Sequence, residues 1–326
     1  MFTNQTERNT TVVLQNQGLL GLVLSSVVTT LPCCVFLYIN LTTLYTLRSK
    51  EVFRETPRYL LLFNLLFADT LQMAHSQSMF SLSLSRVTLA SPVCAILVAL
   101  YSLSHRTSPV TLVLMCLERY IAVCYPLRHS AIITTRNTTL VICIAWTFTS
   151  LNVMIQIIIM FKFSLEDQQN MQMTDYCGKE SVFVDPVSDL YNKASTYFLF
   201  MLGGVTVTFT YTGIMVAARS ASTDKASASR ARRTLLLHLL QMGLTVSSTV
   251  HNSLLIVISK NLDRVPAVRL QIFLYVSINV LPQCLSCLIY GLRDQTIRPF
   301  LMLNLSCQWR GSVFRPAVKQ PRVLVT

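Results

Sequence analysis

The segment MCLERYIAVCYPLRH, Met115 to His129, places an acidic and a basic side chain next to each other at the end of a long apolar run. That run begins at Val93 and continues to Val123. A charged side chain inside lipid is costly, and an acid beside a base offsets part of the cost. The pair Glu118 and Arg119 is therefore a candidate functional site of a membrane protein.

The whole chain has the composition of a membrane protein. Of its 326 residues, 52% are hydrophobic and 13% are charged, whereas roughly a quarter of the residues in soluble domains are charged. Because a helix needs about 20 mainly apolar residues to cross a bilayer, we expect an all-α protein with seven transmembrane helices. The expected spans are residues 19–47, 59–84, 93–123, 139–163, 194–218, 234–258 and 270–292. Residues 1–18 would be an extracellular segment and residues 293–326 a cytoplasmic tail.

The distribution of positive charge predicts the orientation. The net charge is +13, and most of the 27 lysines and arginines lie on the side of the spans that carries Arg119. The positive-inside rule then places the N-terminus outside and the tail in the cytoplasm of a multi-pass plasma-membrane protein. Asn4 and Asn9 begin glycosylation sequons in the segment expected outside. A nucleic-acid function would need basic residues clustered on a soluble module, and the sequence has none.

The cysteines and the tail carry two further expectations. Of ten cysteines, only Cys94 and Cys177 are expected on the oxidising side, so we predict a disulfide between them. After the last span, Arg293 to Leu305 is expected to start an amphipathic helix on the lipid surface. Pro299 should interrupt that helix, which would be short or begin again there.

Several motifs resemble those of one receptor family. MCLERYIAVCYPLRH resembles the acid-Arg-Tyr motif that closes the third helix of rhodopsin-like, class A G-protein-coupled receptors, and its continuation is similar to that of odorant receptors, in particular the fish-type group. FNLLFADTLQ (Phe63 to Gln72) resembles their second helix, and CLIYGLRDQ (Cys287 to Gln295) the end of their seventh. With Trp146 in the fourth span, these landmarks occur in family order along nearly the whole chain.

The resemblance implies a receptor that detects a small extracellular ligand, an odorant, and activates a heterotrimeric G protein. It implies that Glu118 holds Arg119 at rest, and that activation releases Arg119 toward the G protein or Tyr211. Tyr120 and Tyr290 belong to the same activation set. The alternative is an ion pair that only extends to the membrane interface.

Asp69 is the only carboxylate deep within the expected spans. In hydrocarbon it needs a partner or a proton, and Ser108 and Ser286 are expected neighbours by family analogy. Two interpretations stay open, a sodium site at Asp69 and Ser108 or a structural centre of hydrogen bonds.

The middle of the third span carries the candidate ligand site. Tyr101 and His105 share a helix face at i, i+4, and a mid-membrane Arg106 must face the bundle or water. By family analogy this stretch lines the ligand cavity, and its positive charge suits an acidic or hydrogen-bond-accepting molecule. The alternative is that Arg106 pairs internally and supports packing, and the acidic loop 164–192 would instead favour cationic ligands. The predicted ligand-binding set is Tyr101, Ser102, His105, Arg106, Ser195, Thr249, Ser253 and Asn279.

Other functions are weighed against this interpretation. We expect no enzyme and no cofactor, because the five histidines lack metal-ligand spacing and the sequence has no phosphate loop or nucleophile elbow. The same fold would serve a receptor for a peptide or a lipid. A channel or transporter would use Asp69, His105 and Arg106 to line a polar path.

The chain also departs from the family pattern at two motifs. Ser286 and Cys287 stand in place of Asn-Pro in the seventh span, and GLTVSST at residues 243–249 stands in place of an aromatic-Pro segment in the sixth.

Overall fold

The chain is described by a computed structural model in which every regular element of the described residues is helical and none is a strand. This confirms the all-α prediction for that part of the chain. The described residues are 3–85, 87, 89–164, 186–220, 236–237, 240, 243–244, 270, 273–281, 283–284, 288 and 296–309.

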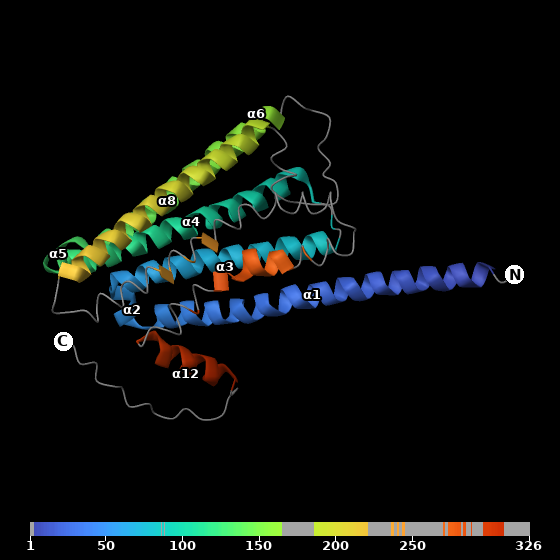
Figure 1. Cartoon of the computed structure of the whole chain (residues 1–326), viewed down its shortest axis with the longest axis horizontal. Helices are drawn as coiled ribbons and strands as arrows, with labels where there is room; N and C mark the ends of the chain where they lie inside the picture. The colour runs from blue at the N-terminus through green and yellow to red at the C-terminus, as the bar shows by residue number, and fades with distance from the viewer. Residues whose placement is uncertain are drawn as a thin grey trace.

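Five long helices lie side by side, as Figure 1 shows, and shorter helices cap one end of them. α2 and α5 lie at that end, and α12 runs beside α1. The elements in chain order are α1 (Thr3–Ser49), α2 (Glu51–Glu55), α3 (Pro57–Leu84), α4 (Ser91–Cys124), α5 (Pro126–Ile132), α6 (Thr135–Ser164), α8 (Pro186–Ser220), the π-helical turn η1 (Tyr275–Val280) and α12 (Ile297–Trp309).

Prolines mark the starts of many helices. Pro57, Pro126 and Pro186 are the first residues of α3, α5 and α8, and Pro92 is the second residue of α4. The first turn of a helix has no intrahelical acceptor for its N–H groups, so proline loses nothing there and its fixed φ favours the turn. These prolines therefore favour helix starts at the four positions where the structure places them.

Four of the described helices are long and apolar enough to cross a membrane: Ser26–Ser49, Pro92–Cys124, Thr135–Ile159 and Pro186–Ala217. α3 contains the second expected span but is less apolar, since Asn64, Asp69, Gln72 and Gln77 all lie in it. The sixth expected span lies mostly outside the described residues and the seventh partly so, and the division into seven spans therefore stays a prediction. α1 begins at Thr3, so residues 3–18 continue the same helix as the first span.

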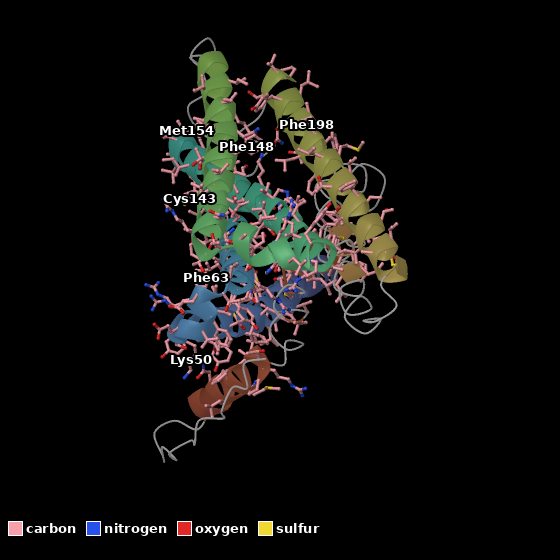
Figure 2. The ribbon with its side chains drawn as sticks, turned by 90° about the vertical axis from the view of Figure 1, so that its left-hand side faces the viewer. Lys50, Phe63, Cys143, Phe148, Met154 and Phe198 are labelled. Atoms are coloured by element: carbon pink, nitrogen blue, oxygen red, sulfur yellow. The ribbon has the colours of Figure 1, made fainter. Side chains whose placement is uncertain are left out.

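α4 is the central helix of the bundle, because it packs against α3, α6 and α8. The other sides of α6 and α8 carry large exposed apolar side chains, and Figure 2 labels Phe148, Met154 and Phe198 among them. Apolar side chains of this kind suit contact with lipid tails. Because lipid is as apolar as leucine, close packing and hydrogen bonds between helices must hold such a bundle together.

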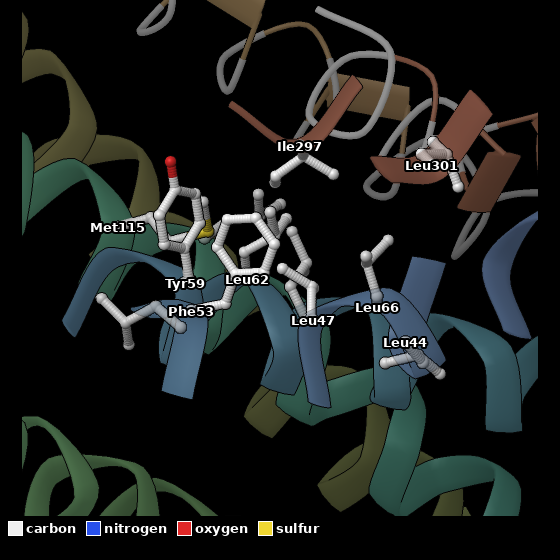
Figure 3. Packing of buried hydrophobic residues seen from close by; sticks show 12 residues of the cluster. Leu44, Leu47, Phe53, Tyr59, Leu62, Leu66, Met115, Ile297 and Leu301 are labelled. Carbon is white, nitrogen blue, oxygen red and sulfur yellow. The ribbon is translucent and has the colours of Figure 1, made fainter. Parts of the chain in front are cut away.

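One apolar cluster joins α1, α2, α3, α4 and α12 at the capped end of the bundle (Figure 3). Leu65, Leu66 and Leu112 are fully buried in it, and Phe53 packs edge-on against Tyr59 with ring centroids 4.9 Å apart. The members of this cluster are Leu44, Leu47, Phe53, Tyr59, Leu61, Leu62, Leu65, Leu66, Leu112, Met115, Ile297 and Leu301.

The helix expected after the last span begins close to Pro299, which is one of the two outcomes expected there. Residues 293–295 lie outside the described residues. α12 runs from Ile297 to Trp309, and Pro299 lies in its first turn, where the missing N–H has no acceptor to lose. Ile297 and Leu301 are fully buried against the cluster in Figure 3. Asn304 Nδ2 also donates a hydrogen bond to Thr46 Oγ1 of α1 at 2.7 Å. α12 is therefore docked on α1 by both apolar and polar contacts.

Candidate functional site

The charged pair at the end of α4 forms the contact that the sequence predicts. Arg119 Nε lies 3.1 Å from Glu118 Oε2, and Glu118 is 7% exposed. The other carboxylate oxygen, Oε1, lies 3.7 Å from His129 Nε2 of α5. Glu118 is thus paired with a guanidinium on its own helix and has an imidazole of the next helix nearby, beyond hydrogen-bond distance. Sequence reasoning did not foresee the histidine.

Tyr120 faces α8, where it packs closely against a glycine. A β-carbon at Gly213 would overlap the Tyr120 ring, so only glycine lets the two helices approach here. The Tyr120 ring centroid also lies 5.8 Å from that of Phe209. Tyr120 and Tyr211 pack against one buried cluster, Cys116, Val207 and Ile214. The structure thus brings Tyr211 close to Tyr120, whereas Tyr290 lies outside the described residues.

Asp69 has one of its two expected neighbours. Ser108 Oγ donates a hydrogen bond to Asp69 Oδ1 at 2.6 Å, and Asp69 is 2% exposed. Ser286 lies outside the described residues. The serine contact fits both a sodium site and a centre of hydrogen bonds.

A second polar group joins three helices and was not predicted. Trp146 Nε1 of α6 donates to Asn64 Oδ1 of α3 at 2.8 Å, and Asn64 Nδ2 donates to Thr111 Oγ1 of α4 at 2.8 Å. Asn64 lies within the FNLLFADTLQ segment, and an amide in this leucine-rich stretch was the sequence feature that could have predicted a hydrogen bond between helices.

Tyr101 and His105 share one face of α4, as their spacing predicts, and that face is turned toward α3. Their rings stack with centroids 5.6 Å apart and an interplanar angle of 10°. Gln72 Nε2 lies 3.0 Å from His105 Nδ1, and the His75 ring lies 5.8 Å from that of Tyr101. Gln72 and His75 of α3 therefore complete this aromatic group, although neither was singled out from the sequence.

Arg106 points to a different side of α4, toward α6 and α8. Its guanidinium donates to Asn152 Oδ1, to Gln156 Oε1 at 3.3 Å and to Asn192 Oδ1 at 2.9 Å. Arg106 is 4% exposed. The internal pairing weighed for Arg106 is thus present, but its partners are side-chain amides from two helices.

The remaining predicted residues are only partly described. Ser102 is 1% exposed on α4, and Ser195 Oγ of α8 donates to the backbone oxygen of Asn192 at 3.2 Å. Cys94 is fully buried in the first turn of α4. The others lie outside the described residues, either entirely or in their side chains: Thr249, Ser253, Asn279, Cys177, Asn4 and Asn9.

Comparison with known proteins decides the family. The sequence matches the 7 transmembrane receptor (rhodopsin family) over residues 39–290. The chain belongs to this receptor family. The receptor is 32% identical to odorant receptor 131-2 of Danio rerio over 80% of its own length and 79% of the relative. It is 25% identical to olfactory receptor 1468 of Rattus norvegicus over 65% of its own length and 69% of the relative. It is 28% identical to olfactory receptor 1E16 of Mus musculus over 49% and 53%, respectively.

Membership of this family states the class of protein in which the charged residues of α4 act. The receptor is a multi-pass plasma-membrane protein and not an enzyme. Its G-protein-coupled family favours a receptor over a channel or transporter. Within it, α4 carries three polar regions in succession: the aromatic group facing α3, the Arg106 amides facing α6 and α8, and the Glu118–Arg119 pair at the helix end.

Proposed function

We propose that this receptor detects a small extracellular ligand of the odorant class and activates a heterotrimeric G protein. The observation that carries the proposal is Glu118 holding Arg119 at 3.1 Å beside α5. The names of its relatives support the ligand class, since all three are odorant or olfactory receptors. The orientation that the charge rule predicts puts this pair on the cytoplasmic side.

α5 supplies a surface for the proposed partner. Leu127 is 95% exposed, and Arg128 beside it is exposed as well. A leucine this exposed suits an apolar pocket of a partner, and the arginine suits acidic residues around that pocket. We infer that the G protein binds α5 together with Arg119 after Glu118 releases it, and that Tyr211 then bonds the freed guanidinium.

The proposed ligand site lies toward the N-terminal end of α4, between about 3.6 turns (Arg106) and about five turns (Tyr101) from Arg119. Tyr101 and His105 offer an aromatic wall and a hydrogen-bonding ring, and Ser102, Arg106 and Ser195 offer polar groups on the side of α6 and α8. Thr249, Ser253 and Asn279 stay in the proposed set. Ligand binding would bias a two-state bundle toward the state in which Glu118 and Arg119 separate.

A second-messenger assay in cells that express the receptor tests this function. Water-soluble odorants, amino acids and steroids are screened, and Arg119→Ala should abolish any response at unchanged surface expression. Arg136→Ala is the matched control, because Arg136 is an exposed basic residue at the start of α6 near the same end. Ligand-evoked ion flux in cells without G protein would contradict the proposal.

Two covalent features also stay in the proposal. We propose the Cys94–Cys177 disulfide and glycans on Asn4 and Asn9, which the predicted outside location of these residues supports. Glycosidase treatment should increase the gel mobility of the receptor, and Asn4→Gln with Asn9→Gln should remove that effect. Cys177→Ser should leave Cys94 open to thiol labelling after denaturation without reductant.

A further inference from the structure

The surroundings of Arg106 contain hydrogen-bond donors in excess of acceptors. The guanidinium is bonded by three amide oxygens, and no carboxylate of the described residues bonds it. Amide dipoles stabilise a buried cation, but they do not neutralise it. The group named here the amide–guanidinium cluster, Ser102, Arg106, Asn152, Gln156 and Asn192, therefore keeps a net positive charge inside the bundle.

Two donors of this cluster are buried and have no partner among the described residues. They are Gln156 Nε2 and Ser102 Oγ, and both residues are 1% exposed. The orientation of the Gln156 amide follows from its contact, because turning it over would place an N–H₂ group against the guanidinium. A buried donor without an acceptor costs about 1–3 kcal/mol, so both groups favour a ligand that accepts hydrogen bonds.

The register of α4 and α6 puts these donors on the same level. Thr107 lies 3.2 Å from Thr149, and Arg106 reaches Asn152, so residue numbers fall along α4 as they rise along α6 and the helices are antiparallel. Ser102 lies four residues before Arg106 on α4, and Gln156 lies four residues after Asn152 on α6. Because the helices are antiparallel, both residues are displaced from the Arg106–Asn152 contact in the same direction along the bundle. The arginine side chain also leans toward the N-terminus of its helix, which brings the guanidinium toward Ser102.

We propose that the amide–guanidinium cluster binds the carboxylate of a small acidic ligand. This rests on the proposed function, since it names the chemical class of the ligand that the receptor detects. A carboxylate is planar and accepts from both nitrogens of one guanidinium edge. Its remaining lone pairs can accept from Gln156 Nε2 and Ser102 Oγ. Its charge also neutralises Arg106, which a neutral aldehyde or ester does not do.

The cluster also offers a route from the ligand to the far end of the bundle. Asn192 is the α8 residue that bonds Arg106, at 2.9 Å. A carboxylate that takes the place of Asn192 Oδ1 frees α8 from this link to α4. α8 is also the helix whose Gly213 packs against Tyr120, next to Glu118 and Arg119. Binding of the acid therefore loosens the same helix pair that is in contact beside the charged pair.

Direct binding to the purified full-length receptor in nanodiscs tests the proposal without any G protein. The probes are acetate, hexanoate and benzoate, each compared with its uncharged amide, and the readout is the midpoint of thermal unfolding. We expect at least one carboxylate to raise the midpoint in a saturable manner and its amide to leave it unchanged. A panel in which no carboxylate raises the midpoint, in which amides raise it equally, or in which chloride alone does so, overturns the proposal.

Gln156→Glu is the most selective variant, because it supplies the carboxylate from the protein itself. Gln156 Oε1 already lies 3.3 Å from the guanidinium, so the variant should unfold at a higher temperature without ligand. It should bind the stabilising carboxylate about 10- to 100-fold more weakly, as expected for the loss of a charged hydrogen-bonding site. Ser102→Ala should weaken the same carboxylate by about tenfold or less. Unchanged carboxylate affinity in Gln156→Glu overturns the proposal.

Gln77→Glu is the matched control, since Gln77 is a buried amide on α3 that donates to Thr30 Oγ1 at 2.8 Å. It should lower the unfolding midpoint, because it places a carboxylate where no described cation bonds it, and it should keep the carboxylate-induced shift.

The proposed receptor function and the proposed carboxylate site can be disproved independently of each other. A Gln156-dependent shift without any second-messenger response contradicts only the proposed function, whereas signalling by neutral ligands without such a shift contradicts only the carboxylate site.

Discussion

Two arginines of the same helix are stabilised in opposite ways. Arg119 lies at the end of α4, where a carboxylate from the adjacent residue pairs with it and its side chain keeps 21% exposure. Arg106 is 4% exposed and is bonded by three uncharged amides from α6 and α8. The first arrangement is local and partly hydrated, so separating it costs little. The second requires three helices to be in register, so it contributes to the assembly of the bundle.

Replacing Arg106 should have the largest effect on stability. Arg106→Met removes the guanidinium and leaves three amide oxygens at a buried helix junction without their donor. We expect a loss of about 3–5 kcal/mol, as for other broken buried charge clusters. Thermal and denaturant unfolding of the purified receptor measure it. A loss of about 1 kcal/mol or less would show that the amide bonds of Arg106 do not hold the three helices together.

The next largest effect is expected where α4 and α8 touch beside the charged pair. Gly213→Ala places a methyl group against the Tyr120 ring and should cost about 1–3 kcal/mol by overpacking. Because the ring must move, we also expect higher signalling without ligand. Gly204→Ala on the same helix is the control, since nothing lies within 4 Å of its new methyl group, and it should stabilise by up to about 1 kcal/mol.

The Gly213 effect can be assigned to one contact with a double variant. Tyr120→Ala removes the ring that the new methyl group meets. In that background Gly213→Ala should cost much less, because neighbouring effects of this kind are not additive. Equal costs in both backgrounds would show that the strain arises elsewhere on α8.

The hydrogen bond between the uncharged Trp146 and Asn64 should have an effect on stability that lies between the effects expected at Arg106 and at the Glu118–Arg119 pair. Trp146→Phe removes the indole N–H that bonds Asn64 Oδ1 at 2.8 Å and leaves a buried acceptor. The expected loss in the free energy of unfolding is about 1–2 kcal/mol. Trp146 lies ten residues before Gln156 on α6, about 15 Å along the helix axis, so carboxylate binding at Gln156 should not change.

The smallest effect on stability is expected at the charged pair itself. Glu118→Gln should change the free energy of unfolding by about 1 kcal/mol or less, as is usual for partly hydrated ion pairs. It should nevertheless raise second-messenger output without ligand, since Arg119 loses its counter-charge. Chemical unfolding and basal signalling are measured on the same preparations. A large stability loss with unchanged basal output would mean that the pair is structural.

Much of this fold follows from local patterns. Long apolar runs predicted the positions of α4 and α6 to within about four residues at each end, because helix formation in lipid depends on composition and on nearby backbone atoms. α8 begins at Pro186, well before the start of the span expected at residues 194–218. Contacts between near neighbours in sequence were also accessible, as the Glu118–Arg119 pair and the stacked Tyr101 and His105 show. The Asp69–Ser108 bond between helices was found because the motif resemblance supplied the pairing.

Other features needed the packed bundle. Nothing in the neighbourhood of Arg106 in the sequence points to Asn152 or Asn192, since amides are uncharged and occur throughout the chain. The same holds for the fit of Gly213 against Tyr120. The docking of α12 is a further case, because Ile297 and Leu301 pack on a cluster built by α1 to α4.

The order of residues along the chain thus specified a helical membrane protein and the charged pair at the end of α4, because apolar length, charge asymmetry and adjacent side chains act over short distances. The motifs that resemble the receptor family added the receptor function. The partners of the buried Arg106 arise from three helices that meet far apart in sequence. Only their register selects which amide oxygens face the guanidinium and which donors are left to bind an acid.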